Sequence, residues 1–123
     1  MASNPDFVQY VVDQCSGAGE VSVRKMFGDY GLYCLSDRDK DDPMALPKIV
    51  GLISDNALYI KPTDAGKQLL RSEVMRPPYD GAKPYCYIEE VDDHDYLSAL
   101  VRATCDALPA PKPKKKKADK KNL

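Results

Sequence analysis

The chain has 123 residues, a length typical of one domain, and its formal net charge is only −1. Residues 109–123 hold seven lysines and one aspartate, which leaves 11 basic and 18 acidic side chains in residues 1–108. An acidic body is therefore followed by a basic tail. No apolar run approaches the ~18 residues that a membrane span needs, which argues against a transmembrane protein.

The cysteines and the N-terminus indicate the compartment. No two of the four cysteines form a C-x-x-C pair, and the N-terminus has no charged leader followed by an apolar core. We expect a cytoplasmic protein without a bound metal or cofactor, because the spacing supports neither a metal site nor a disulfide. The cysteines then serve as small core hydrophobes; they are Cys15, Cys34, Cys86 and Cys105.

The first half of the chain predicts one helix and a set of strands. Asn4 is the expected N-cap, Pro5 suits the first helical position, and an apolar face follows at helical spacing, formed by Phe7, Val8, Val11, Val12 and Cys15. Residues 20–35 alternate as extended chain, either as two strands or as one long strand kinked at the glycines 28 and 31. Residues 36–47, rich in charge and proline, predict an exposed loop. Strands are expected at 48–54 and 57–61, joined by a two-residue turn at 55–56.

The second half predicts a helix over 64–73 with Leu69 and Leu70 turned inward, ended by two prolines at 77–78. A last hairpin is expected from Tyr79 and residues 85–91 around a turn at 80–83. Asp92 or Asp93 then caps a final helix whose apolar stripe is Leu97, Leu100, Val101, Cys105 and Leu108. Residues 109–123 form a Pro/Lys-rich tail that we expect to be disordered.

The order is thus α, three or four strands, α, two strands, α. Short turns make neighbouring strands antiparallel, and helices bridge the longer connections. We therefore predict an α+β fold, a two-layer sandwich of one antiparallel sheet with helices on one face.

Four segments in order, residues 24–33, 48–53, 58–62 and 78–84, give the chain a family resemblance. It resembles the TfoX/Sxy N-terminal domain over about residues 5–108, in a short stand-alone form with a lysine tail. The resemblance implies a non-enzymatic module of bacterial competence (DNA-uptake) regulation that acts through a protein partner, such as a transcription activator of the cyclic-AMP receptor type. The loop at 36–47 is longer than usual, and the second domain of the longer regulators is missing. No catalytic residue carries over.

The lysine tail is one candidate site. Its cations would attract phosphate weakly and without sequence preference, since no aromatic residues are interleaved for base stacking. The alternative is a solvated, solubilising terminus. The lysines are Lys112, Lys114, Lys115, Lys116, Lys117, Lys120 and Lys121.

Tyr85 and Tyr87 are the other candidates. They share one face of a predicted strand and, if the helix-free side of the sheet is exposed, would form a protein-interaction or homodimer surface. Ordinary amphipathic packing also explains them. An enzyme is the competing class and would use this face with Tyr59 as a further polar group, but the sequence offers no nucleophile and no catalytic motif.

Two further positions point to no site. Arg24 and Lys25 stand on alternate sides of one strand, so both cannot reach the same phosphate. His94, the single histidine, lies among three aspartates at a helix start. Consecutive ligands do not converge on one metal ion, so we expect capping carboxylates and a solvated imidazole.

Overall fold

The computed structural model describes residues 3–26, 29–37, 39 and 41–109. The elements in chain order are α1 (Pro5–Gln14), a 3₁₀ turn η1 (Ser16–Ala18), β1 (Gly19–Met26), β2 (Asp29–Ser36), β3 (Lys48–Ser54), β4 (Ala57–Ile60), α2 (Asp64–Lys67), β5 (Met75–Arg76), β6 (Tyr85–Ile88) and α3 (His94–Ala107). The predicted order of helices and strands is confirmed. Residues 20–35 form two strands rather than one kinked strand.

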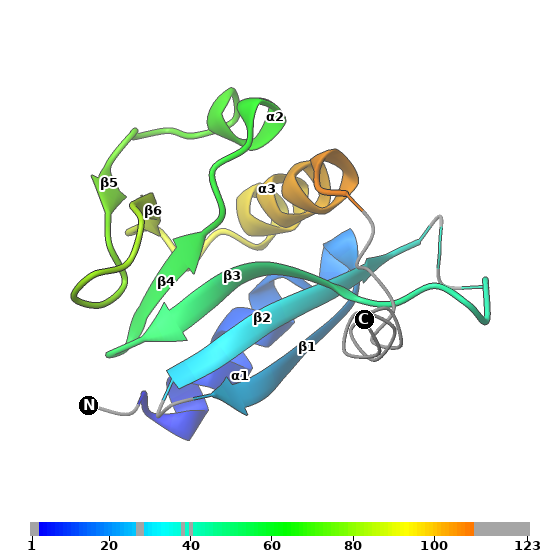
Figure 1. The fold of residues 1–123 in the computed structure, drawn as a ribbon, viewed down its shortest axis with the longest axis horizontal. Coiled ribbons are helices and arrows are strands. Elements are labelled where there is room, and N and C mark those ends of the chain that lie inside the picture. The colour runs from blue at the N-terminus through cyan, green and yellow to red at the C-terminus, as the bar shows by residue number, and fades with distance from the viewer. Residues whose placement is uncertain (1–2, 27–28, 38, 40, 110–123) are drawn as a thin grey trace, which may run out of the picture.

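The strands form one antiparallel sheet of six in the order β1-β2-β3-β4-β6-β5. Strands β1 to β4 are successive neighbours, and β6 then pairs with β4 and places β5 at the far edge (Figure 1). The register between β2 and β3 shifts between Leu32 and Tyr33, a β-bulge that brings Val50 into the core.

Helices α1 and α3 pack against each other on the same side of the sheet (Figure 1). One apolar cluster joins Val11 of α1 and Leu100 of α3 to Leu32, Ile53 and Leu58 of the sheet. Among the described residues, no helix lies on the other side of the sheet. The α+β fold with helices on one face is therefore confirmed.

The helix caps follow the sequence. The side chain of Asn4 accepts a hydrogen bond from the backbone N–H of Asp6, with Pro5 at the start of α1. Of the two candidate caps for α3, the structure selects Asp93, which accepts from the N–H of Tyr96. Each cap satisfies a backbone donor that the first helical turn leaves free.

The turn at Asp55 and Asn56 is also confirmed. Both residues have positive φ, 51° and 57°, as a type I′ hairpin requires. Asn56 also ties down the N-terminal segment, because its side-chain oxygen accepts from the N–H of Asn4 and its own N–H donates to Ser3.

Two expectations after β4 were wrong. The helix predicted over 64–73 ends at Lys67, because the following amides of Leu69 and Leu70 bond three residues back instead of four and tighten the chain into turns. Leu70 packs against the core, but Leu69 is 42% exposed, since a single helical turn cannot direct two consecutive residues inward. The last hairpin begins earlier than predicted, at β5, since the prolines at 77–78 have no N–H to continue the ladder. Its second strand, predicted over 85–91, ends at Ile88.

The described part of the loop at 36–47 is mostly exposed, although Ser36 itself is buried at the end of β2. The tail beyond Pro109, with its lysines, lies outside the described residues. Within the described residues, no helix combines the length and apolar character that a bilayer crossing requires.

Candidate protein-interaction face

The helix-free side of the sheet, here called the open face, presents the side chains that alternate with the core residues. Tyr85 and Tyr87 of β6 lie on it, because Cys86 and Ile88 between and beside them are buried in the core. The sequence placed these four side chains correctly. By the same alternation and strand register, the open face also carries Arg24, Tyr33, Ile49, Leu52, Tyr59, Lys61 and Arg76.

The centre of the open face is apolar and aromatic. Leu52 opposes Tyr59, and Tyr59 opposes Tyr87, across three neighbouring strands. The rings of Tyr59 and Tyr87 have centroids 5.5 Å apart and are tilted by 52°, a favourable aromatic arrangement. Leu52 and Tyr59 are only 9% and 8% exposed, whereas Tyr33 and Tyr87 on either side are half-buried.

Arginines stand at the two ends of this row. The guanidinium carbon of Arg24, on the edge strand β1, lies 5.1 Å from the ring centroid of Tyr33. On the opposite edge strand, β5, the guanidinium carbon of Arg76 lies 4.6 Å from the ring centroid of Tyr87. Stacking on an aromatic ring orders a guanidinium and leaves its N–H edge available. Neither arginine makes an ion pair within the described part of the chain.

Lys61 and Tyr85 complete the face. Lys61 follows the buried Ile60, and partial burial lowers the pKa of its ammonium group. Burial also raises the pKa of the Tyr85 hydroxyl, with a smaller effect from Tyr79.

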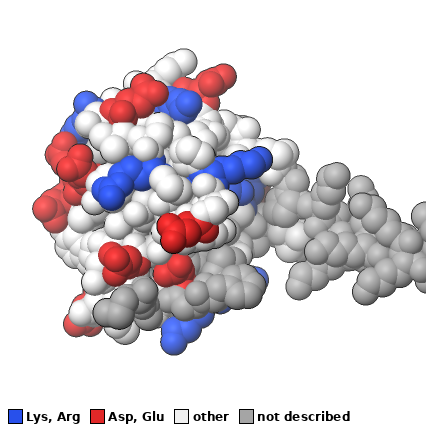
Figure 2. Space-filling model, turned by 60° about the vertical axis from the view of Figure 1, so that its left-hand side comes forward, with Lys and Arg blue, Asp and Glu red and all other residues white. Residues whose placement is uncertain are grey.

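Figure 2 shows the surface with the β5–β6 edge turned forward. Acidic and basic side chains are interspersed there with uncharged surface, and they do not form one patch of a single charge.

A hollow of about 260 Å³ next to β6 is lined by charged and aromatic side chains, of which Arg71 and Glu90 form an ion pair with each other. Its lining includes Arg71, Tyr87 and Tyr96. Arg71 bonds Glu90 at 3.1 Å and Asp93 at 2.6 Å, and its guanidinium carbon lies 4.2 Å from the centroid of Tyr96. These contacts hold the segment after α2 against the start of α3, so we assign the residues around the hollow a structural role.

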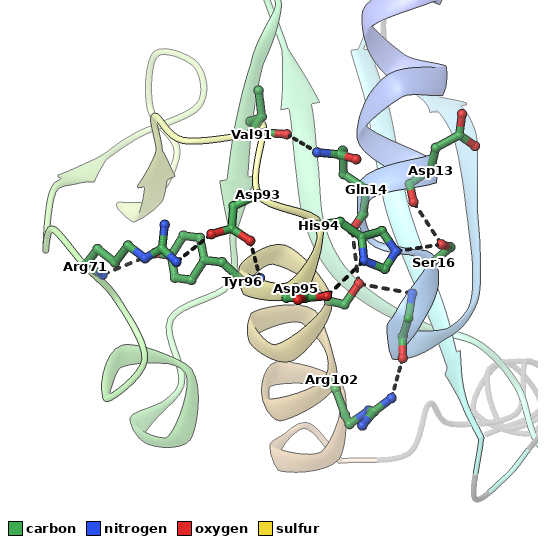
Figure 3. A network of polar contacts seen from close by, with 12 residues as sticks. Asp13, Gln14, Ser16, Arg71, Val91, Asp93, His94, Asp95, Tyr96 and Arg102 are labelled. Atoms are coloured by element: carbon green, nitrogen blue, oxygen red, sulfur yellow. Dashed lines mark hydrogen bonds and ion pairs between the residues drawn. The ribbon is translucent and has the colours of Figure 1, made fainter.

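The polar contacts around His94 also have a structural role (Figure 3). Its ring nitrogens lie 3.3 Å from the Ser16 hydroxyl and 3.4 Å from an oxygen of Asp95. Nearby, Ser98 accepts from the N–H of Gly17 and donates to the carbonyl of Gln14. The network therefore fastens the turn after α1 to α3. No group of three or more potential metal ligands gathers in the part of the chain that the structure describes.

Most residues of the open face could not be identified from the sequence alone. It singled out Tyr85 and Tyr87, and Tyr59 only for an enzyme, but not the arginines that flank them. The sequence pattern points to Arg24 only beside Lys25, as a phosphate site that alternation argues against. Alternation does separate these two, because Lys25 pairs with Tyr30, whose side chain packs against the core. The available signal was alternation within each strand, but it needed the strand order to become a surface.

These features define an α+β two-layer domain with one aromatic, arginine-flanked sheet face. The family model of the TfoX N-terminal domain matches residues 13–108, and the chain belongs to this family. The chain is also 38% identical over 118 residues, 95% of its own length and 93% of the relative's, to an uncharacterized 12.7 kDa protein in the trpE 5′ region of Spirochaeta aurantia. No solved structure matches. Membership supports a competence-regulator-like module.

Proposed function

We propose that this protein is a non-enzymatic regulatory module that binds a protein partner, a transcription activator, through the open face. Control of DNA uptake is the process that the family suggests. The observation that carries the proposal is the pair of ring-stacked arginines, Arg24 and Arg76, one at each edge of an apolar and tyrosine-lined strip. Tyrosine and arginine are the residue types that most often anchor protein interfaces.

The geometry favours an acidic protein segment. Each arginine is held by a ring and has no carboxylate partner in the described chain, so its fork of N–H groups is ready for a carboxylate. Lys61 adds a partly desolvated cation between them. Ile49 and Tyr87, both half-buried, supply apolar and aromatic contact between the arginines, since Leu52 and Tyr59 beneath them are almost fully buried. A partner with acidic side chains at both ends of an apolar stretch would match this distribution.

Single-stranded nucleic acid suits the face less well. Base stacking needs open aromatic rings, but guanidinium groups lie over Tyr33 and Tyr87. The acidic body, residues 1–108, would also repel phosphates. Sequence-independent binding through the lysine tail is a separate prediction, independent of the open face.

The test is affinity capture from cells of the source organism with three tagged forms of the full chain. The double variant Arg24→Glu/Arg76→Glu removes both cations, and Lys67→Glu/Lys83→Glu makes the same change of charge at exposed positions outside the face. We expect a discrete protein to be retained by the wild type and the control but lost by the face variant. Equal retention by all three, or no discrete protein, would refute the proposal.

A further inference from the structure

The edge strand β1 offers an unpaired ladder. It lies at one end of the sheet, so one of its edges has no hydrogen-bonded neighbour among the described strands (Figure 1). It is eight residues long and contains no proline, whereas β5 at the opposite edge has two residues. A long edge strand of this kind is a template for pairing with another chain.

The apolar side chains at this edge are incompletely covered. Val21 and Val23 of β1 point to the helix side and are half-buried, while their partners on β2, Cys34 and Leu32, are fully buried. Val12 of α1, the helix that contacts β1, is half-buried as well. A further strand beside β1 would cover these valines.

We propose that β1 pairs with β1 of a second copy of this chain, antiparallel and about a two-fold axis at Ser22. In an antiparallel ladder, hydrogen-bonded and non-hydrogen-bonded residue pairs alternate along the strands. A two-fold axis between two identical strands therefore has to set one residue opposite the same residue of the second copy. The axis at Ser22 sets Glu20 opposite Arg24 of the second copy and Val21 opposite Val23. Symmetry makes each of these pairs twice.

The charges support this register over an axis at Val23 or at Arg24. Glu20 and Arg24 are exposed, and neither makes an ion pair within the described chain. An axis at Arg24 would oppose two guanidinium groups, and an axis at Val23 would set Val21 against Lys25. With the axis at Ser22, Lys25 meets Gly19, which has no side chain to obstruct it.

The pairing would join two sheets into one and place the two open faces side by side. Glu20 of the second copy then lies next to Arg24, so each copy contributes a carboxylate to the other's face. One partner could contact both faces at once. Both proposals use Arg24, whose guanidinium would then be shared between Glu20 of the second copy and an acidic partner. The pairing itself can form whether or not the open face binds a partner, and sedimentation of the purified chain tests the pairing alone.

Sedimentation velocity of the full chain over a wide concentration range tests the register by charge exchange. We expect a dimer whose dissociation constant rises about tenfold in Glu20→Arg or in Arg24→Glu, since each change creates two like-charge pairs, and returns toward the wild-type value in the double exchange. A wild-type monomer at the highest concentration would overturn the proposal. So would a dimer that neither single change weakens.

A covalent trap gives an independent measurement if a charge variant does not fold. Ser22 faces its own copy across the axis, so Ser22→Cys should form an intermolecular disulfide with copper phenanthroline and oxygen as oxidant. The native cysteines are buried and should not react. The exposed control Ser72→Cys should stay monomeric on a non-reducing gel. Equal cross-linking of both variants, or of neither, would contradict the axis at Ser22.

Discussion

Lys48 joins the start of β3 to the end of α3, and replacing it tests how the two layers are held together. Its ammonium group donates to the carbonyl oxygens of Cys105 at 2.8 Å and Leu108 at 2.9 Å. The last turn of α3 contains no basic residue, so Lys48 supplies the cation that complements this end of the helix dipole. Lys48→Met keeps the apolar stem and removes both hydrogen bonds.

The expected loss follows from these two bonds. A hydrogen bond to a charged group contributes about 1.5–3 kcal/mol, but Lys48 is partly exposed and water can replace it at both carbonyls. We therefore expect the free energy of unfolding to fall by about 1–3 kcal/mol, which lowers Tm by roughly 5–15 °C in a domain of this size.

Urea denaturation should show a lower midpoint with an unchanged m-value. The control is Lys83→Met, at an exposed position that makes no hydrogen bond or ion pair in the described chain. If Lys48→Met is no more destabilising than this control, the joint between β3 and α3 does not contribute to stability and the reasoning fails.

Other predictions concern the interior and acid stability. The buried Thr104 hydroxyl has no hydrogen-bond partner among the described residues, so Thr104→Val should raise the urea midpoint, by about 1 kcal/mol in free energy; a lower midpoint would mean that the hydroxyl is bonded. A Cβ at Gly51 would lie 2.2 Å from the Tyr59 carbonyl oxygen, so Gly51→Ala should destabilise the fold by about 2 kcal/mol or more, and an unchanged midpoint would contradict this contact. The four cysteines are buried and should resist a thiol reagent until the protein unfolds; rapid native labelling would show otherwise. The hydrogen bond from Arg71 lowers the pKa of Asp93, so its stabilising effect is present above the unfolded pKa of about 3.8 and is lost as pH falls through the lower folded value. Asp93→Asn should therefore flatten the acid limb of the stability curve, and superimposable limbs would refute this.

Local signals predicted the fold because several segments determine their own structure. The side chain of Asn4 caps α1 without help from distant residues. The turn between β3 and β4 is likewise local, because Asp55 and Asn56 tolerate the positive φ that it requires. The region after β4 failed for the opposite reason. Leu69 and Leu70 have helical propensity, but packing of Leu70 and the tight turns after Lys67 decide the local conformation there.

The open face depends on contacts between strands, which the sequence does not display. Arg24 reaches Tyr33 diagonally across β1 and β2, and Arg76 reaches Tyr87 across β5 and β6. These pairs exist only for the observed register, which includes a bulge and the insertion of β6 between β4 and β5. Alternation alone identified the tyrosines of β6 but not the arginines beside them.

Site-specific photo-crosslinking in cells tests most directly whether the open face contacts a protein partner. A photoreactive phenylalanine derivative would replace Tyr85 on the open face and, as a control, the exposed Ala99 on α3. The account predicts a discrete protein adduct from position 85 and none from position 99. Adducts from position 99 alone, or from neither position in cells where the wild-type protein is functional, would contradict it.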